Sequence, residues 1–352
     1  MVGPCVEGTG DRGRQQRDLA PVWTARYILA AMMDGLNVLV VRFGALGNVV
    51  LTTPLVRAIH RTHPHAAITF VTKEAYAPLL TGNPHLYAVE PHEPGASLGS
   101  LAARLRRTRW DHRIDLHGSV RSFMLRRLVG GPWSVDRPPR TQRTLHIWFG
   151  IEPPGGGEPV ARRHFRAARG LDLTPDSDPP EVYPSPNDEQ VADGVVHRAF
   201  VAIAPGAAHA TKRWPARHWR ELADRLDAAG RSVVVLGTAA ERGAFGGTRA
   251  IDACGIGLGP TAALLRRAQV AITNDSGLMH VAAAVGTPLI ALFGPTVASF
   301  GFAPGGDTVT RLERALPCRP CSPFGSAHCP VRHHRCMIDI TPADVVARLP
   351  AA

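Results

Sequence analysis

The segment from Asn274 to Thr296 (NDSGLMHVAAAVGTPLIALFGPT) constrains the fold of this chain more strongly than any other part of the sequence. Its pattern predicts a strand end, a tight turn, a helix and a second strand. The turn places Asp275, Ser276 and Gly277 at a helix N-terminus, where unpaired backbone N–H groups and the helix dipole favour an anion. His280 lies four residues beyond Ser276, so both side chains lie on one face of that helix. The segment therefore predicts an α/β unit that binds a phosphate-bearing ligand.

The same alternation extends over most of the chain. Short runs rich in β-branched residues alternate with longer helical patterns, which is typical of a mostly parallel sheet. The predicted strands are 37–43, 67–72, 113–118, 200–205, 232–237 and 270–275, and the predicted helices are 49–63, 216–230 and 261–268. A Pro, Gly and Asp-rich stretch before 186 separates the two series. We predict two Rossmann-like domains, 35–185 and 186–352, after a disordered extension at 1–34.

The charge of the chain does not select a partner by itself. The 352 residues carry 40 Lys and Arg against 29 Asp and Glu, a formal net charge of +11. The positive charge comes from Arg, which binds phosphates and carboxylates through two parallel hydrogen bonds. It equally suits an anionic lipid surface, or reflects an Arg bias of the genome. No apolar run approaches the roughly 20 residues that span a bilayer, and residues 1–34 lack the pattern of a signal peptide.

Two further loops of the second domain are predicted to end at the edge that carries this turn. Ligands of open α/β sheets bind beyond the carboxyl ends of the strands, where the domain's first loop brings Thr211 and Lys212. A hydroxyl and an ammonium there suit a diphosphate, although a Lys-Arg pair before a helix is more often a solvated turn. Glu241 follows the next strand and suits either sugar hydroxyls or a helix N-terminus. The structural alternatives are a helix cap for Asp275 and a core position for His280.

The first domain offers a weaker set of candidates. Gly44 and Gly47 flank a turn that lets a ligand approach the backbone, but a G-x-x-G pair alone is weak evidence. The segment DLHGSVRS (115–122) ends a later strand and brings His117 and Arg121 to the same edge. Arg121 suits a carboxylate or phosphate on a second ligand. The neighbouring arginines at 126 and 127 are expected to form a solvated helix face.

Four cysteines crowd into a short segment near the C-terminus. They are Cys318, Cys321, Cys329 and Cys336, with the spacing C-x2-C-x7-C-x6-C and three histidines between them. One CxxC pair is a metal signature, but the second pair is wider than in a zinc ribbon. Structural zinc, reduced thiols and labile disulfides all remain open. Catalytic thiol chemistry is not expected, because the spacing fixes no base beside a cysteine.

Together these segments resemble the glycosyltransferase family 9 heptosyltransferases, which transfer heptose from ADP-heptose to the inner core of lipopolysaccharide. The resemblance covers about residues 36 to 349. It rests on VVRFGALGNVVLTTPLVRAI (40–59), IDLHGSVRS (114–122), PGAAHATKRWP (205–215) and the long segment 274–296. The cysteine segment CRPCSPFGSAHCPVRHHRCM (318–337) also looks like one found in part of the family.

The resemblance implies a GT-B architecture, with two Rossmann-like domains facing one another. It implies an inverting transfer that needs no metal or other cofactor for catalysis, with the nucleotide-sugar in the C-terminal domain and the acceptor facing the N-terminal one. The implied partners are ADP-heptose or a related nucleotide-sugar and a lipid-linked saccharide acceptor at the inner membrane surface, and no nucleic acid. The implied location is cytoplasmic, peripheral on the inner face of the inner membrane.

The resemblance also assigns roles to residues. The implied donor-binding residues are Thr211, Lys212, Glu241, Asp275, Ser276, Gly277 and His280. Among them Lys212 would stabilise the departing diphosphate. Gly47, His117 and Arg121 would lie toward the acceptor.

One position departs from the family pattern. The first-domain loop of the family usually ends in Gly-Asp, whose Asp is the general base, and this chain has Asn48 there. An amide cannot accept a proton at neutral pH. Either another base acts, with Asp115 and His117 the nearest candidates, or Asn48 only orients the acceptor, or the chain is an impaired member that binds nucleotide-sugar or lipopolysaccharide. An oxidoreductase is disfavoured, because GALGN lacks the G-x-G-x-x-G spacing.

Overall fold

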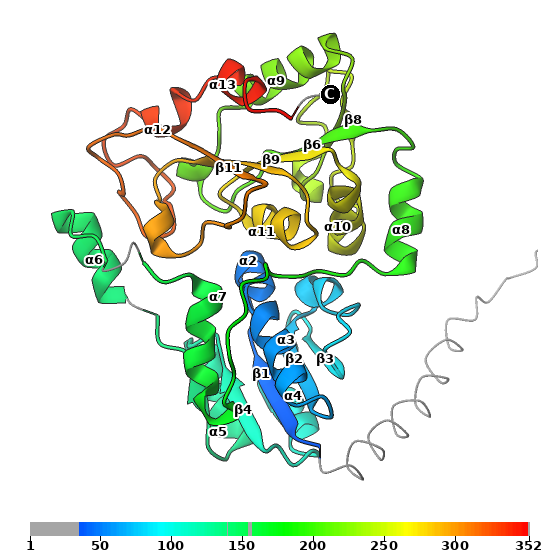
Figure 1. Ribbon diagram of the computed structural model, residues 1–352, viewed down its shortest axis with the longest axis vertical. Coiled ribbons are helices and arrows are strands. Elements are labelled where there is room, and N and C mark those ends of the chain that lie inside the picture. The colour runs from blue at the N-terminus through cyan, green and yellow to red at the C-terminus, as the bar shows by residue number, and fades with distance from the viewer. Residues whose placement is uncertain (1–34, 139, 154–156, 351–352) are drawn as a thin grey trace, which may run out of the picture.

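The computed structural model describes residues 35–138, 140–153 and 157–350, and the predicted extension 1–34 lies outside them. In this part of the chain, two parallel sheets lie one above the other, each flanked by helices (Figure 1). The strand orders are β3-β2-β1-β4-β5 and β11-β10-β9-β6-β7-β8. Each order places the first strand of the sheet beside its fourth, as in Rossmann-like domains. The prediction of two such domains is confirmed.

The elements follow the alternation expected from the sequence. The strands are β1 (Asn37–Val41), β2 (Ala67–Lys73), β3 (Ala88–His92), β4 (His112–Asp115), β5 (Ser134–Val135), β6 (Phe200–Ala204), β7 (Ser232–Val235), β8 (Ile251–Asp252), β9 (Val270–Asn274), β10 (Leu289–Phe293) and β11 (Val309–Glu313). The α-helices are α2 (Leu46–Val50), α3 (Thr53–Thr62), α4 (Leu98–Leu105), α5 (Val120–Val129), α6 (Arg140–Phe149), α7 (Val160–Arg163), α8 (Pro186–Asp193), α9 (Ala216–Ala228), α10 (Leu258–Arg267), α11 (Gly277–Ala284), α12 (Arg335–Ile338) and α13 (Pro342–Val346). The 3-10 helices are η1 (Glu74–Leu79), η3 (His164–Leu171), η4 (Ala210–Lys212), η5 (Ala239–Glu241) and η6 (Ala298–Phe300). Among the described residues, no helix is long and apolar enough to cross a membrane.

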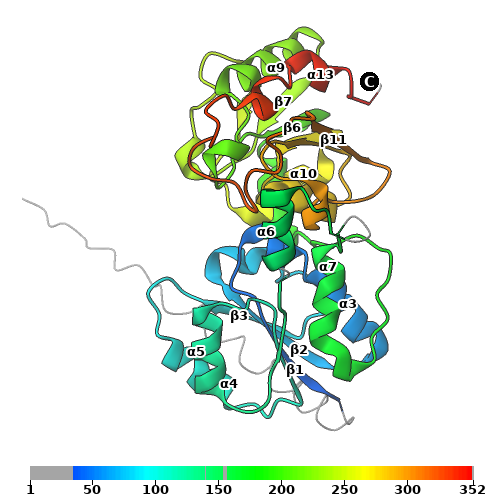
Figure 2. The same ribbon diagram turned by 90° about the vertical axis from the view of Figure 1, so that its left-hand side faces the viewer.

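Each sheet is buried on both faces. In β1, Val38 and Val40 pack with α3, whereas Leu39 and Val41 pack with α4 and α5. Figure 2 shows the same division, with α3 and α7 on one side of the sheet and α4 and α5 on the other. Successive side chains of a strand point to opposite faces, so this burial explains the continuous apolar runs.

The helix predicted within 49–63 starts near Thr52, Thr53 and Pro54 as expected, but the residues before that point are not part of it. The chain instead forms α2, a turn, and then α3, whose first turn contains Pro54. Pro54 has no N–H and cannot donate to the carbonyl of Val50. The Thr53 hydroxyl donates to that carbonyl at 2.9 Å, and the Thr52 hydroxyl donates to the Val49 carbonyl at 2.6 Å. Two threonine side chains therefore satisfy the helix end that proline interrupts.

The two domains meet through α2 and α11, the helices that directly follow β1 and β9. A Cβ at Gly47 would overlap the imidazole of His280, and a Cβ at Gly277 would lie 2.8 Å from the Leu46 side chain. Val50 of α2 belongs to an apolar cluster that otherwise lies mostly in the second domain. The carboxyl ends of both sheets therefore face one another, in contact, at two glycines.

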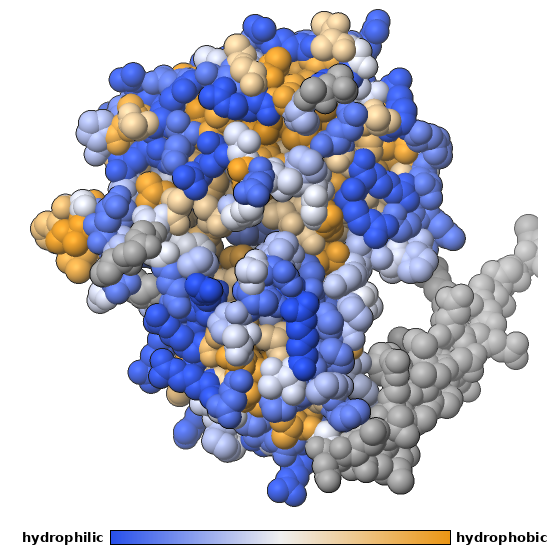
Figure 3. All heavy atoms as spheres, in the orientation of Figure 1, coloured by the Kyte–Doolittle hydropathy of each residue, from blue (hydrophilic) through white to orange (hydrophobic). Residues whose placement is uncertain are grey.

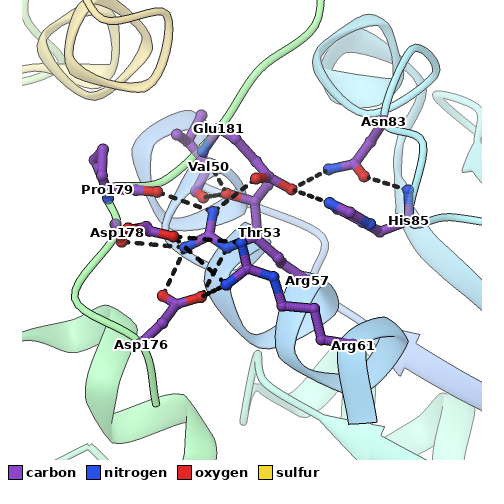
Figure 4. Close-up of polar contacts among 10 residues, drawn as sticks. All are labelled: Val50, Thr53, Arg57, Arg61, Asn83, His85, Asp176, Asp178, Pro179 and Glu181. Atoms are coloured by element: carbon purple, nitrogen blue, oxygen red, sulfur yellow. Dashed lines mark hydrogen bonds and ion pairs between the residues drawn. The ribbon is translucent and has the colours of Figure 1, made fainter. Parts of the chain in front are cut away.

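A polar cluster holds the interdomain segment against α3 (Figure 4). Arg57 is 4% exposed and binds both the Asp176 carboxylate at 2.7 Å and the Glu181 carboxylate at 2.6 Å. The backbone N–H of Glu181 donates to the Thr53 hydroxyl at 2.9 Å. The N–H of the next residue, Val182, instead donates to a carbonyl at the end of α11.

Replacing Arg57 with alanine is expected to lower the free energy of unfolding by about 3 kcal/mol, because it removes the buried cation that binds Glu181 and leaves Asp176 with only the exposed Arg61. Arg61 gives a matched control, since it binds the same Asp176 carboxylate but its side chain is 55% exposed. Arg61→Ala should cost less than about 1 kcal/mol. Equal losses in a urea titration of the two variants would contradict this interpretation.

Candidate functional site

The loops after β6 and β9 bring a cation and a carboxylate together at the switch point of the second sheet. Lys212 Nζ lies 2.5 Å from Asp275 Oδ2, and the Thr296 hydroxyl donates to the same oxygen at 2.6 Å. The side chain of Lys212 is 14% exposed and that of Asp275 is 6% exposed. Residues more than 60 positions apart in sequence thus form one charged pair where Rossmann-like domains bind ligands.

The N-terminus of α11 beside this pair has no side-chain cap. Ser276 is the N-cap residue, but its hydroxyl makes no cap hydrogen bond. This hydroxyl is buried and has no partner in the part of the chain that the structure describes. The alternative in which Asp275 caps the helix is wrong, because its carboxylate holds Lys212 and Thr296 instead. The first N–H groups of α11 and a buried hydroxyl are left to bind an anion.

His280 lies in the first turn of α11, as predicted. Its ring is almost fully buried against Gly47 of the first domain. Burial lowers the pKa of His280 to about 4, with a smaller opposing effect from Asp275. The imidazole is therefore neutral at pH 7 and marks the contact between the domains. Its role in binding a sugar stays a prediction.

Thr211 and Glu241 both bind parts of their own chain. The Thr211 hydroxyl donates to the Ser326 carbonyl at 3.0 Å and accepts from the Ser326 N–H at 2.8 Å. It thereby fastens the Lys212 loop to the cysteine-rich segment. Glu241 Oε2 accepts from the Thr238 N–H at 2.8 Å in a capping box. This oxygen therefore has the role at a helix N-terminus that was the alternative to binding a sugar. The other oxygen, Oε1, lies against Gly206, at the end of the first strand of the domain.

In the first domain, β1 and β4 end side by side and bring His117 against the glycine turn. The Gly44 carbonyl lies 3.1 Å from His117 Nδ1, and a carbonyl can only accept, so Nδ1 carries the proton. The lone pair of the ring is then on Nε2. Burial, followed by repulsion from Arg42, lowers the pKa of His117 to about 4. His117 is a neutral base in a half-buried position.

Asp115 is a structural residue rather than a free base. It is fully buried, and its Oδ1 accepts from the backbone N–H groups of His117 and Gly118 at 2.8 and 3.1 Å. Its Oδ2 lies 3.1 Å from Arg126 Nε. Arg126 is 23% exposed, so the expectation that it belongs to a solvated face is wrong. Of the two candidates to replace the base, His117 is the one with an uncommitted lone pair.

A cleft of about 430 Å³ opens beside this loop. Arg121, which follows the lining residue Val120 in sequence, is exposed and does not itself line the cleft, and its guanidinium lies 5.9 Å from the ring centre of Phe43. The cleft is lined by Gly118, Ser119, Val120, Phe123, Arg126, Val135, Asp136, Arg137 and Pro138. The residues after Val135 were not anticipated, because a strand of two residues leaves almost no alternation to recognise. Asn48 lies half-buried on α2, next to Gly47.

Helix α6 was also missed, and it reaches the second domain. Arg143 is buried among the rings of Phe300, Phe302 and Phe324, at 5.9, 4.8 and 5.5 Å from their centres. Its Nη2 donates to the Phe300 carbonyl at 2.9 Å. The opposite face of α6 is apolar and exposed, and it forms the knob at the left margin of Figure 3. The partners of Arg143 lie more than 150 residues away, so no local pattern indicated them.

The cysteine-rich segment carries thiols in the structure. Cys318, Cys321, Cys329 and Cys336 are all unpaired. Burial raises the pKa of Cys336 to about 11, so this thiol is protonated at pH 7. Among the residues described, no three His, Cys, Asp or Glu side chains are grouped so as to hold a metal ion. Structural zinc stays a prediction.

Comparison with known proteins yields consistent matches. Residues 98–328 match the model of glycosyltransferase family 9 (heptosyltransferase). Lipopolysaccharide heptosyltransferase 1 of Pseudomonas aeruginosa is 29% identical over 87% of this chain and 91% of that protein. Among solved structures, a family 9 glycosyltransferase of Veillonella parvula has a TM-score of 0.74 at 22% identity, covering 89% of this chain and 95% of that one. The Escherichia coli ADP-heptose lipopolysaccharide heptosyltransferase II has a TM-score of 0.71 at 23% identity, covering 89% and 97%. The predicted GT-B fold is confirmed.

Proposed function

Because the chain belongs to glycosyltransferase family 9, we propose that this glycosyltransferase moves heptose from ADP-heptose to the inner core of lipopolysaccharide or a related lipid-linked saccharide. The observation that carries the proposal is the pairing of Lys212 with Asp275 beside the uncapped α11 N-terminus. A heptosyltransferase of Pseudomonas aeruginosa matches nearly the whole chain, and an ADP-heptose enzyme shares its fold.

The donor half of the site is assigned to the second domain. The diphosphate would lie against the N–H groups that follow Ser276, within reach of Lys212. Glu241 Oε1, over Gly206, would accept from ribose hydroxyls. As the bond between the anomeric carbon and the phosphate oxygen breaks, negative charge grows on the diphosphate. Lys212 and the α11 terminus would stabilise that charge without reorganising, which is the main source of rate in such sites.

The acceptor half is assigned to the first domain. The cleft is lined by the exposed Arg137, by Arg126, which holds Asp115, and by Asp136, which Arg163 holds, so Arg137 is the cation that would bind an anionic group of the saccharide there. In the transfer, the acceptor hydroxyl forms its bond to the anomeric carbon from the face opposite the leaving diphosphate, and its proton must go to a base. We assign that base to His117 Nε2, and Asn48 would orient the hydroxyl through its amide.

A second candidate function is an impaired family member that binds nucleotide-sugar or lipopolysaccharide, and Asn48 is the observation that favours it. Transfer assays separate the two functions. A wild-type chain that transfers heptose excludes the binding-only function. A chain that transfers only after Asn48→Asp supports it.

Calorimetry with ADP, UDP and GDP tests the donor assignment. We expect ADP to bind and UDP and GDP to bind at least tenfold more weakly. Lys212→Ala should weaken ADP binding, whereas Lys73→Ala serves as the matched control, because Lys73 is exposed in the first domain. Equal binding of all three nucleotides, or no effect of Lys212→Ala, would refute the assignment. Addition of a chelator should leave the transfer rate unchanged.

A further inference from the structure

Helix α5 presents an apolar face that nothing in the described chain covers. Val120, Phe123, Met124 and Leu128 are 77, 52, 51 and 40% exposed. They follow the spacing i, i+3, i+4 and i+8, which places them along one side of the helix. The opposite side contributes Leu125 to the core with α4. Figure 2 shows α5 at the outer margin of the first domain, on the side of the sheet away from α3 and α7.

The surroundings of this face are strongly positive. Residues 95–135, which include α4 and α5, contain eight arginines and two aspartates. Neither aspartate faces the apolar side chains, because Asp111 accepts from the Asn37 N–H and Asp115 is buried against Arg126. Arg121 and Arg127 are exposed on α5 itself. A third arginine, from the end of α4, donates to the Leu128 carbonyl at 3.1 Å.

We propose that this α5 face, formed by Val120, Phe123, Met124 and Leu128 with Arg127 among them and Arg121 at its edge, docks the protein on a membrane rich in anionic phospholipid. The apolar side chains would enter the boundary between headgroups and acyl chains, and the arginines would bind the lipid phosphates. A second copy of the chain is a poor occupant, because two surfaces with the same positive charge would repel.

The position of the face deepens the proposed function, on which this step rests. Val120 and Phe123 also line the 430 Å³ cleft assigned to the acceptor. An acceptor whose lipid stays in the bilayer would therefore enter the cleft from the docked surface. Docking would raise the local concentration of lipid-linked acceptor without adding any contact to its saccharide.

Co-sedimentation with vesicles tests the proposal without any nucleotide-sugar. Wild-type protein should bind vesicles of equal parts phosphatidylcholine and phosphatidylglycerol, and bind far less to phosphatidylcholine alone. The variant Met124→Ser with Leu128→Ser changes no charge and no cleft residue, and should bind roughly tenfold more weakly. Arg127→Glu reverses one charge and should weaken binding roughly 20-fold. Val346→Ser with Arg348→Glu, exposed on or just after α13, is the matched control and should bind as the wild type does.

Three outcomes would overturn the proposal. The first is unchanged binding by Met124→Ser with Leu128→Ser. The second is loss of binding only in a variant of the α6 knob, Trp148→Ser with Phe149→Ser, which would place the docking surface elsewhere. The third is vesicle binding that is weakened by Arg127→Glu and by competing duplex DNA but is unchanged in Met124→Ser with Leu128→Ser. That result would indicate that the surface binds a nucleic acid. The assay contains no sugar donor, so it tests membrane binding separately from heptose transfer. A protein that fails to transfer heptose can still bind vesicles, and the two failures are distinguishable.

Discussion

Replacing Lys212 with alanine should lower the heptose transfer rate constant kcat about 10²–10³-fold, the usual effect of removing one preorganised group that stabilises developing charge. The physical reason has two parts. The leaving diphosphate loses the cation that its growing negative charge would meet. Asp275, 6% exposed and paired with Lys212 Nζ at 2.5 Å, would then face the same diphosphate with an uncompensated charge.

Lys212→Arg is the informative companion variant. The chain contains only two lysines among its 40 Lys and Arg residues, so lysine at this position cannot be attributed to the composition of the protein. The compact ammonium of Lys212 pairs with Asp275, and a larger planar guanidinium would have to reach that carboxylate with a different geometry. We expect Lys212→Arg to restore part of the nucleotide affinity but little of kcat. Steady-state rates that match the wild type for both variants would contradict the assigned role.

His117→Gln should lower kcat about 100-fold or more, as expected for loss of a general base, with little change in ADP affinity. Glutamine places a polar amide near the position of Nε2 but cannot take up the acceptor proton. The pKa of His117 is lowered to about 4. The active form is the unprotonated ring, so kcat/KM should stay level at higher pH and fall as the pH drops through about 4. That limb should be absent in the variant.

The double variant Asn48→Asp with His117→Gln distinguishes a base from a structural residue. If His117 acts as the base, the carboxylate introduced at position 48 should recover most of the lost rate, because it would offer an alternative proton acceptor on α2. A purely structural His117 would not be rescued in this way. His112→Gln, at the start of β4, the strand that leads to His117, is the matched control and should retain the wild-type rate. A gain in rate from Asn48→Asp alone, with His117 intact, would favour the impaired-member function.

Local patterns predicted the elements better than their ends. Runs such as Val38–Val41 are apolar on both faces, and that alone indicates a strand within a parallel sheet. Several predicted strands end one to three residues too late. Residues that follow some of these strands, such as Phe43 after β1 and Leu236 after β7, stay buried while the chain leaves the ladder. Hydropathy records burial, not hydrogen bonding, so it cannot find that point.

The site was predictable where one motif supplied the geometry. The uncapped start of α11 at Ser276 follows from a single segment, and the shared sheet edge explains why Lys212 reaches Asp275. Contacts between residues far apart in sequence were not predictable, because no local sequence pattern indicates them. Arg143 packs against three phenylalanine rings of the other domain. The Thr211 hydroxyl is hydrogen-bonded to Ser326 and is not free to bind a ligand. These pairings depend on how the domains pack, which no window of sequence contains.

In the segment that joins the two domains, two consecutive residues, Glu181 and Val182, bind to different domains. Glu181 is bound by Arg57 and Thr53, so it moves with the first domain. Val182 packs in the core of the second domain and donates to the Ala284 carbonyl, so it moves with that one. At this connection, a rotation of one domain against the other would fall on the few bonds between these two residues, whereas α6 joins the domains a second time through Arg143 and the Phe300 carbonyl. The Glu181–Val182 connection therefore provides a pivot of almost no length between the two domains.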